Sequence, residues 1–179
     1  QYRIAQSVNG NGWQYYHHFP IGAYIEPGIP YVILNSSVHD TLFNKDWADE
    51  VLDYPSVVHH NGDDGIALLK DGVIIDAIGV ENDDPGSGWD VAGVTNATAN
   101  HTLVRQLSVT GGNGGDWSTS AGTDENNSEC IVYDQDTWDY LGYHGTTSDE
   151  PSIAISSPEN GATLSTNQVT IEFSVNNFN

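Results

Sequence analysis

The chain has 179 residues, of which 37% are hydrophobic and 10% aromatic, so it can bury a core and falls outside the disordered and low-complexity classes. Four Lys and Arg residues stand against 25 Asp and Glu residues, which gives a formal charge of −21 at pH 7. A surface this acidic repels phosphate backbones, so we expect no direct nucleic-acid binding. The charge favours divalent cations, high salt or a basic partner, or it only keeps a secreted protein soluble.

The abundance of Gly, Asn, Asp, Ser and Thr between short apolar runs is typical of an all-β protein with many turns. The lone cysteine, Cys130, cannot form an internal disulfide, so no disulfide framework is expected. No run approaches the roughly 20 apolar residues of a membrane span, and we expect no membrane insertion.

The first half of the chain predicts short strands joined by turns. Tyr2–Ala5 is a first strand, and Trp13–Phe19 alternates two faces over its whole length. Pro27-Gly28 has the composition of a type II turn and leads into a strand at Tyr31–Asn35. The only predicted helix is Lys45–Leu52, a short connection with its apolar residues on one face.

The clearest local signal is a β-hairpin. Two apolar runs, Ile66–Leu69 and Val73–Ile78, are separated by Lys70-Asp71-Gly72. Asp-Gly favours a tight hairpin turn because both residues tolerate positive φ. The preceding "NGDDG" is a polar corner that turns the chain into the first strand of this hairpin.

Two long polar loops follow, Glu81–His101 and Thr110–Glu129. Loops of this length are either functional or held in place by their own side chains, and Trp89 and Trp117 are the expected anchors. We expect each loop to fold back and cover a sheet edge. The strands predicted between and after the loops are Thr102–Arg105, Ile131–Tyr133 and Trp138–Leu141.

We assign residues 1–145 to a β-sandwich, residues 146–151 to a linker and residues 152–179 to a second unit. The second unit has predicted strands at Ile153–Ser156 and Val169–Val175, with a turn at Asn160-Gly161. Two strands cannot bury a core alone, so it is either the first part of another Ig-like domain or a donor-strand segment. Its missing strands would come from a longer polypeptide, or from a neighbouring domain or identical subunit by β-strand addition.

Six segments, in this order along residues 2–144, resemble the lamin-tail domain of secreted bacterial proteins: "YVILNSS", "NGDDGIALLKDGVIIDAIG", "DPGSGWDVAG", "HTLVR", "GDWSTSAGT" and "IVYDQDTWDYLGYH". The resemblance implies an immunoglobulin-like β-sandwich inside a large exported protein, beside nuclease, phosphatase or further sandwich domains. The chain enters the family pattern near the end of its first segment, which implies that the family's first strands are missing here. Cys130 also departs from it, standing where the family tends to carry a large aromatic residue.

Calcium is the leading metal candidate, because it prefers several oxygen ligands from carboxylates and carbonyls. The first long loop offers one set of carboxylates: Glu81, Asp83, Asp84 and Asp90. The "NGDDG" corner offers the weaker pair Asp63 and Asp64, for which turn chemistry alone is a sufficient explanation. We therefore predict calcium in the loop, which is long, acidic and in need of something to order it.

Other chemistry is poorly supported. The chain contains no G-x-S-x-G, H-E-x-x-H, P-loop or G-x-G-x-x-G motif, so no catalytic residue is assigned, and Cys130 is interpreted as a buried structural thiol. The adjacent pairs His17-His18 and His59-His60 would point to opposite faces of a strand and do not converge on one ion. Five Trp and nine Tyr leave a sugar-stacking surface open, although such residues more often fill a core.

The sequence thus predicts a non-catalytic, extracellular or cell-surface module with a structural or adhesive role. It would belong to a larger exported protein or to a head-to-tail filament, with calcium as its candidate cofactor. One alternative is an accessory domain of a secreted nuclease or phosphatase whose catalytic residues lie outside this chain. The other is a carbohydrate-binding module with a polysaccharide ligand.

Overall fold

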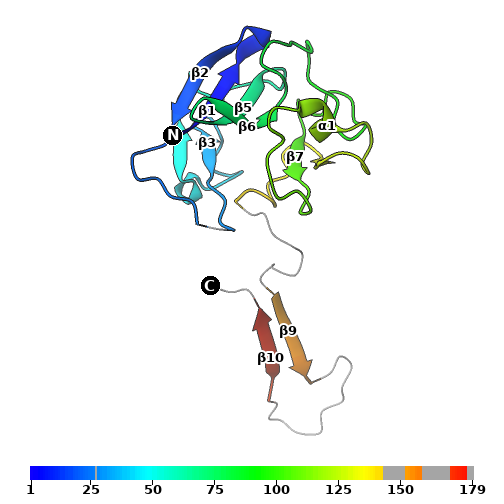
Figure 1. Cartoon of the computed structure of the whole chain (residues 1–179). Coiled ribbons are helices and arrows are strands. Elements are labelled where there is room, and N and C mark those ends of the chain that lie inside the picture. Colours follow the sequence, from blue (N-terminus) through cyan, green and yellow to red (C-terminus); the bar gives the residue numbers. More distant parts are fainter. Residues whose placement is uncertain (27, 143–151, 159–169, 177–179) are drawn as a thin grey trace. The chain divides into compact units, whose positions relative to one another are not determined.

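The computed structural model describes residues 1–26, 28–142, 152–158 and 170–176, and the chain divides into two compact units, Gln1–Tyr143 and His144–Asn179 (Figure 1). The elements, where η marks a 3₁₀ turn, are β1 (Tyr2–Ser7), η1 (Val8–Gly10), β2 (Trp13–His18), β3 (Ile33–Asn35), η2 (Lys45–Trp47), β4 (Glu50–Leu52), β5 (Gly65–Lys70), β6 (Val73–Ile78), β7 (Thr102–Arg105), α1 (Trp117–Ala121), β8 (Cys130–Tyr133), β9 (Ser152–Ser157) and β10 (Glu172–Asn176). The predicted all-β class is confirmed. The predicted linker lies outside the described residues.

The main sheet of the first unit has four antiparallel strands in the order β2-β1-β5-β6. Alanines occupy matching positions in three of these strands, because Ala5 pairs with Ala67 and Ala67 pairs with Ala77. None of the three is more than 5% exposed. Together with Leu69 they form one core cluster, so the centre of the sheet is built from small side chains that let neighbouring segments approach closely.

The predicted hairpin is confirmed as β5 and β6. Lys70 pairs with Val73, and the two residues between them have positive φ, 51° at Asp71 and 86° at Gly72. This is the backbone that the Asp-Gly signal predicts, since a two-residue hairpin turn of this kind needs positive φ at both central positions.

The predicted helix at Lys45–Leu52 is wrong. The segment instead forms the 3₁₀ turn η2 and then the strand β4, which pairs in parallel with β3. The amide of Asp46 donates to the side chain of Asn44, so this cap closes one turn only. The segment forms a strand because its backbone pairs with β3, and the local sequence does not reveal this long-range pairing.

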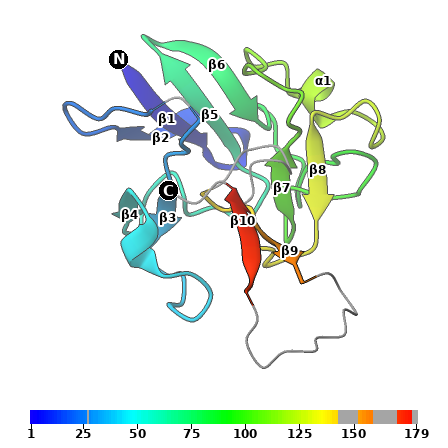
Figure 2. The same cartoon turned by 90° about the horizontal axis from the view of Figure 1, so that it is seen from below.

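The strands β7 and β8 form a separate antiparallel pair, and Figures 1 and 2 both place β7 next to the four-stranded sheet on the side of β6. The short helix α1, which the sequence did not predict, lies within the second long loop and is capped at its N-terminus by Asp116. The predicted strand at Trp138–Leu141 is wrong, because the chain turns there with the Leu141 amide donating to the Trp138 carbonyl. A second core cluster joins α1 to β8 and to the first long loop: Val91, Ala97, Trp117, Ala121 and Cys130.

The second long loop covers the outer edge of β6, as predicted. The side-chain amide of Asn113 accepts from the Ala77 N–H at 3.0 Å and donates to the Ala77 carbonyl at 2.8 Å. The amide of Gly114 donates to the carbonyl of Ile75 at 3.1 Å. One side chain therefore occupies the place of a neighbouring strand and closes an edge that would otherwise offer unpaired backbone groups.

Both predicted tryptophan anchors are confirmed. Trp117 is 3% exposed in the second core cluster, and Trp89 packs against the same cluster. The ring of Trp89 also lies over Gly79, where an added Cβ would come within 2.5 Å of it. The two loops are thus held in place by their own side chains.

The second unit contains the antiparallel strands β9 and β10, in which Phe173 pairs with Ile155. Both side chains are largely exposed, at 61% and 64%. The predicted turn at Asn160-Gly161 and the start of the predicted strand at Val169 lie outside the described residues. In the described ranges, none of the helices has the length and apolar character that crossing a membrane requires.

Substituting Gly112 with alanine tests the closed edge of β6. A Cβ at this position would lie 2.0 Å from the carbonyl oxygen of Ile75, which is backbone and cannot move aside cheaply. We expect Gly112→Ala to lower the free energy of unfolding by about 2 kcal/mol or more in urea titrations. Gly111→Ala is the matched control, since nothing lies within 4 Å of its Cβ, and it should stay within about 0.5 kcal/mol of wild type. Equal effects of the two substitutions would contradict the close approach.

Candidate functional site

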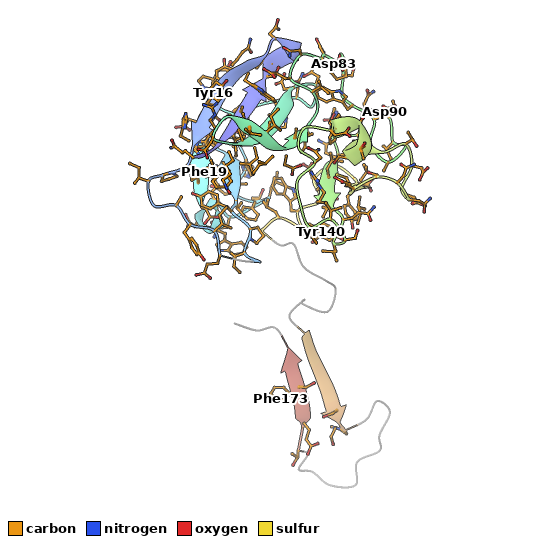
Figure 3. The ribbon with its side chains drawn as sticks, in the orientation of Figure 1. Tyr16, Phe19, Asp83, Asp90, Tyr140 and Phe173 are labelled. Atoms are coloured by element: carbon orange, nitrogen blue, oxygen red, sulfur yellow. The ribbon has the colours of Figure 1, made fainter. Side chains whose placement is uncertain are left out.

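The first long loop spreads its carboxylates instead of gathering them. Asp84 accepts from the amide of Gly86 at 2.7 Å, and Asp90 accepts from the amide of Asn96 at 2.9 Å. Figure 3 shows Asp83 and Asp90 well apart, the first toward the β1–β2 end of the unit and the second near α1. Two of the four predicted calcium ligands therefore bind the backbone of their own turns.

The start of the same loop is held by backbone contacts to the main sheet. The carbonyl of Glu81 accepts from the Ser7 hydroxyl and from the Gly12 amide. A Cβ on Gly10 would lie 2.8 Å from the carbonyl carbon of Asp83, so the chain packs directly on η1. The loop is ordered by these contacts, which removes the main reason for expecting an ion to order it.

The acidic pair of the "NGDDG" corner is buried, unlike the carboxylates of the loop. Asp63 and Asp64 are each 6% exposed. The carboxylate of Asp64 accepts from the Asn9 amide at 3.0 Å and from Gln6 Nε2 at 2.8 Å. These bonds join the corner before β5 to the end of β1, so Asp64 has a structural role in fixing the register of the two strands.

The corner is sealed by the first long loop. Thr98 Oγ1 donates to the Gly62 carbonyl at 2.6 Å and accepts from the Trp89 amide at 2.8 Å. Gly62 has φ 107°, and a Cβ there would lie 2.5 Å from the Thr98 carbonyl oxygen. The acidic pair therefore lies beneath a tightly packed backbone, which accounts for its low exposure.

Several polar atoms around the pair have no hydrogen-bond partner among the described residues. They are Asp63 Oδ1, Gln6 Oε1 and His59 Nε2. The other ring nitrogen of His59 bonds Ser56 Oγ at 2.7 Å, and Gln6 Nε2 also donates to the His59 carbonyl at 3.1 Å. Buried polar groups are normally paired, so three unpaired atoms around two carboxylates identify this corner as the candidate site.

A pocket of about 230 Å³ opens beside Asp64 and is lined by His60, Thr98 and His101 among others. His60 keeps an exposed surface, but the protein packed around its ring lowers the pKa of the imidazole, against the opposing effect of Asp64 and Asp63. The neutral ring is thus favoured, and His60 is a weak counter-charge for the pair.

Sequence reasoning ranked this corner below the loop and missed its surroundings. Gln6 lies near the end of β1, beyond the strand predicted at Tyr2–Ala5, and His59 belongs to the pair His59-His60, which the sequence does not connect with the acidic corner. Gln6 is far from Asp63 in sequence, and His59 precedes Asp63 by four residues without forming a known motif with it. The only available signal was the pair of adjacent carboxylates at the start of a buried strand, a position that normally calls for one turn-forming residue.

No group of three His, Cys, Asp or Glu side chains within the described ranges is arranged to hold a metal ion. The calcium site at Glu81, Asp83, Asp84 and Asp90 therefore stays a prediction. The corner at Asp63 and Asp64 is not a group of three such side chains, because its third polar side chain is an amide. Comparisons of the chain with family models, with curated proteins and with solved structures found no match. The resemblance to lamin-tail domains likewise stays a prediction.

Cys130 is buried as predicted, at 5% exposure, in the cluster that joins α1 to β8. Burial raises the pKa of its thiol, against the opposing effect of the nearby Arg105 guanidinium. The thiolate is the reactive form, so both access and ionisation work against a nucleophilic role.

We expect Cys130 in the native chain to react with a thiol reagent such as DTNB on the order of a thousandfold more slowly than in urea-unfolded protein at pH 8. The rate should follow the small fraction of molecules that open. The Cys130→Ser variant supplies the blank. A native rate close to that of the unfolded chain would show an accessible thiol and contradict the structural assignment.

Proposed function

We propose that the chain is a non-catalytic structural or adhesion module of an extracellular or cell-surface assembly, with a first unit of lamin-tail, Ig-like sandwich type. The observation that carries the proposal is the β9–β10 hairpin, whose two antiparallel strands are the described part of the second unit and carry an exposed apolar pair. The module joins its neighbours by β-strand addition at this hairpin, either to another domain of a longer exported protein or to an identical subunit in a head-to-tail filament.

A two-stranded sheet is at best marginally stable in water, and three or more strands with a buried face are needed for independent stability. In the hairpin, the cross-strand pair Phe173 and Ile155 is more than half exposed on each side, and Ile171 is 59% exposed. Burying a Phe or Ile side chain stabilises by roughly 1.5–3 kcal/mol, so added strands that cover this pair would make the hairpin stable.

The chemistry of the first unit supports a non-catalytic role. Its polar side chains bind backbone groups at loops and strand edges, as Asn113 does on β6 and Asp64 does on η1. Its thiol is buried. A net charge of −21 keeps such modules apart in solution and soluble at the high local concentrations of an extracellular assembly. Hydrolysis of DNA by this chain alone would contradict the proposal.

Hydrogen exchange tests whether the hairpin needs added strands. In dilute, monomeric chain, we expect amides of β9 and β10 to exchange near the unprotected rate, because the two-stranded sheet opens readily. Amides of the β5–β6 hairpin, which has a paired strand on one side and a covered edge on the other, should stay protected in the same sample. Equal protection of the two hairpins in the monomer would contradict the proposal.

The concentration dependence of that exchange identifies the partner. If identical subunits supply the strands, protection of β9 and β10 rises with protein concentration, together with a sedimenting mass above 19.4 kDa. Phe173→Ser should remove this effect. Val73→Ser is the matched control, because Val73 is equally apolar and 67% exposed but lies at the start of β6 in the other unit.

One observation favours a second candidate function, carbohydrate binding. Trp47 is 72% exposed, and it lies beside a pocket of about 440 Å³ that is also lined by Phe43, Trp138 and Asp139. Phe43 stacks on Trp138 with ring centroids 6.2 Å apart and meets Trp47 edge to face at 5.9 Å. An exposed indole packed against the Phe43 ring and adjacent to a carboxylate combines an apolar stacking face with a polar group that orients a ligand.

Retention on polysaccharide tests this candidate. Trp47→Ala should abolish retardation of the chain in gels that contain a bound polysaccharide, because it removes the only largely exposed indole among the described residues. Tyr24→Ala is the control, since Tyr24 is equally exposed at 73% but lies outside that pocket. Loss of retention in both variants, or in neither, would contradict a sugar site at Trp47.

A further inference from the structure

The corner before β5 holds two carboxylates that are almost completely buried. Asp63 and Asp64 are both 94% buried, since each is 6% exposed. Moving an ionised carboxylate out of water costs several kcal/mol unless hydrogen bonds or an opposite charge compensate it. Asp64 has two hydrogen-bond donors, but Asp63 Oδ1 has none among the described residues.

The cationic side chains of the chain do not supply the missing charge. The sequence contains only four Lys and Arg residues, and the structure describes all of them at other places. Arg105 is paired with Asp76 and Glu129, and Lys45 with Asp40. The remaining two lie over aromatic rings, Arg3 over Tyr16 and Lys70 over Tyr2.

Gln6 gives an independent indication of what the corner binds. It is 1% exposed, and its Nε2 donates to Asp64 Oδ2 and to the His59 carbonyl. Both acceptors require the nitrogen at this position, so the orientation of the amide is fixed. Its oxygen belongs to the same amide group that bonds Asp64, and it is buried with no donor among the described residues. A buried carbonyl oxygen and a buried carboxylate oxygen, both without donors, are the groups that a cation pairs with.

We propose that Asp63, Asp64 and the amide oxygen of Gln6 bind one Ca²⁺ ion at the junction of β1 and β5. The donors are all oxygens, as Ca²⁺ prefers, and its tolerance of irregular geometry suits ligands from a bend and a strand. Two carboxylates match its charge. Backbone carbonyls and water complete the six to eight ligands that the ion takes.

The ion would link the end of β1 to the start of β5, so its effect is on the stability of the first unit. This inference does not rest on strand addition at β9–β10, which belongs to the other unit. It also assigns calcium to a place other than the first long loop, where the carboxylates of Asp84 and Asp90 accept from turn amides.

Thermal unfolding of the full chain with and without Ca²⁺ tests the site. Protein stripped with EDTA and dialysed into 150 mM NaCl, which screens diffuse binding to the acidic surface, is compared with protein in Ca²⁺ at about 100 times the fitted Kd. We expect Tm to rise by roughly 5–10 °C. No rise would overturn the proposal, because the unpaired atoms would then be satisfied by water, and a rise with Zn²⁺ but not Ca²⁺ would overturn it in favour of a site at His59.

Two variants locate the effect. Asp63→Asn keeps the size of the side chain and removes the charge, so it should abolish the Ca²⁺-dependent rise in Tm. Asp84→Asn, an isosteric change in the acidic loop, should leave the rise intact. The reverse pattern would place the ion in the loop and overturn the proposal. Sedimentation of the same samples scores self-association separately, so failure here is distinguishable from failure of the proposed assembly role.

A measurement on the wild-type chain keeps the test valid if Asp63→Asn does not fold. In ¹⁵N-labelled protein, Ca²⁺ should shift the side-chain amide of Gln6 and the backbone amides of Asp63, Asp64 and Asn9 most strongly. Shifts that centre on residues 81–90 instead, or that spread evenly over the acidic surface, would overturn the proposal.

Discussion

The arrangement of the first unit depends on one arginine. Arg105, at the end of β7, binds both carboxylate oxygens of Asp76 on β6, at 2.9 and 3.0 Å, and Glu129 at 2.8 Å. Asp76 also accepts from the Asn113 amide, so the same cluster reaches the loop that closes the edge of β6. The three ionised side chains are 20–35% exposed. Their ion pairs are therefore intermediate between surface pairs, which contribute little to stability, and buried pairs, which are strongly destabilising to break. In a chain with 25 acidic residues, removal of this cation would leave two carboxylates facing each other across the sheets.

Several acidic residues of this chain serve as acceptors for the backbone. Asp84, Asp90 and Asp116 each bind an amide within their own turn or helix start, and Asp49 binds the amide of Val32. A short carboxylate satisfies a turn amide without help from a distant residue, which lets long loops keep fixed shapes. Asp63 differs from these residues, because it is buried and its Oδ1 has no hydrogen-bond partner among the described residues.

Features that depend on neighbouring residues were predictable, and features that depend on distant pairing were not. The β5–β6 hairpin follows from Asp71-Gly72, and the burial of Trp117 follows from the need to anchor a long loop. The strand β4 was not predictable, because it pairs with β3, which lies outside its own segment, and parallel pairing leaves no local signature in the sequence. The surroundings of the candidate site were not predictable for the same reason: Asp64 bonds to Gln6 on another strand, and Thr98, in a loop that folds over the corner, bonds to the carbonyl of Gly62.

The contact between Asn113 and Ala77 closes the main sheet on one side. The Asn113 side chain satisfies both backbone groups of Ala77, but it has no backbone edge to which another strand could pair, so the sheet ends at β6. The strand at the opposite side is β2, where the side chains of Tyr15 and Tyr16 are 38% and 44% exposed. In the main sheet, the side of β6 is thus closed to an added strand.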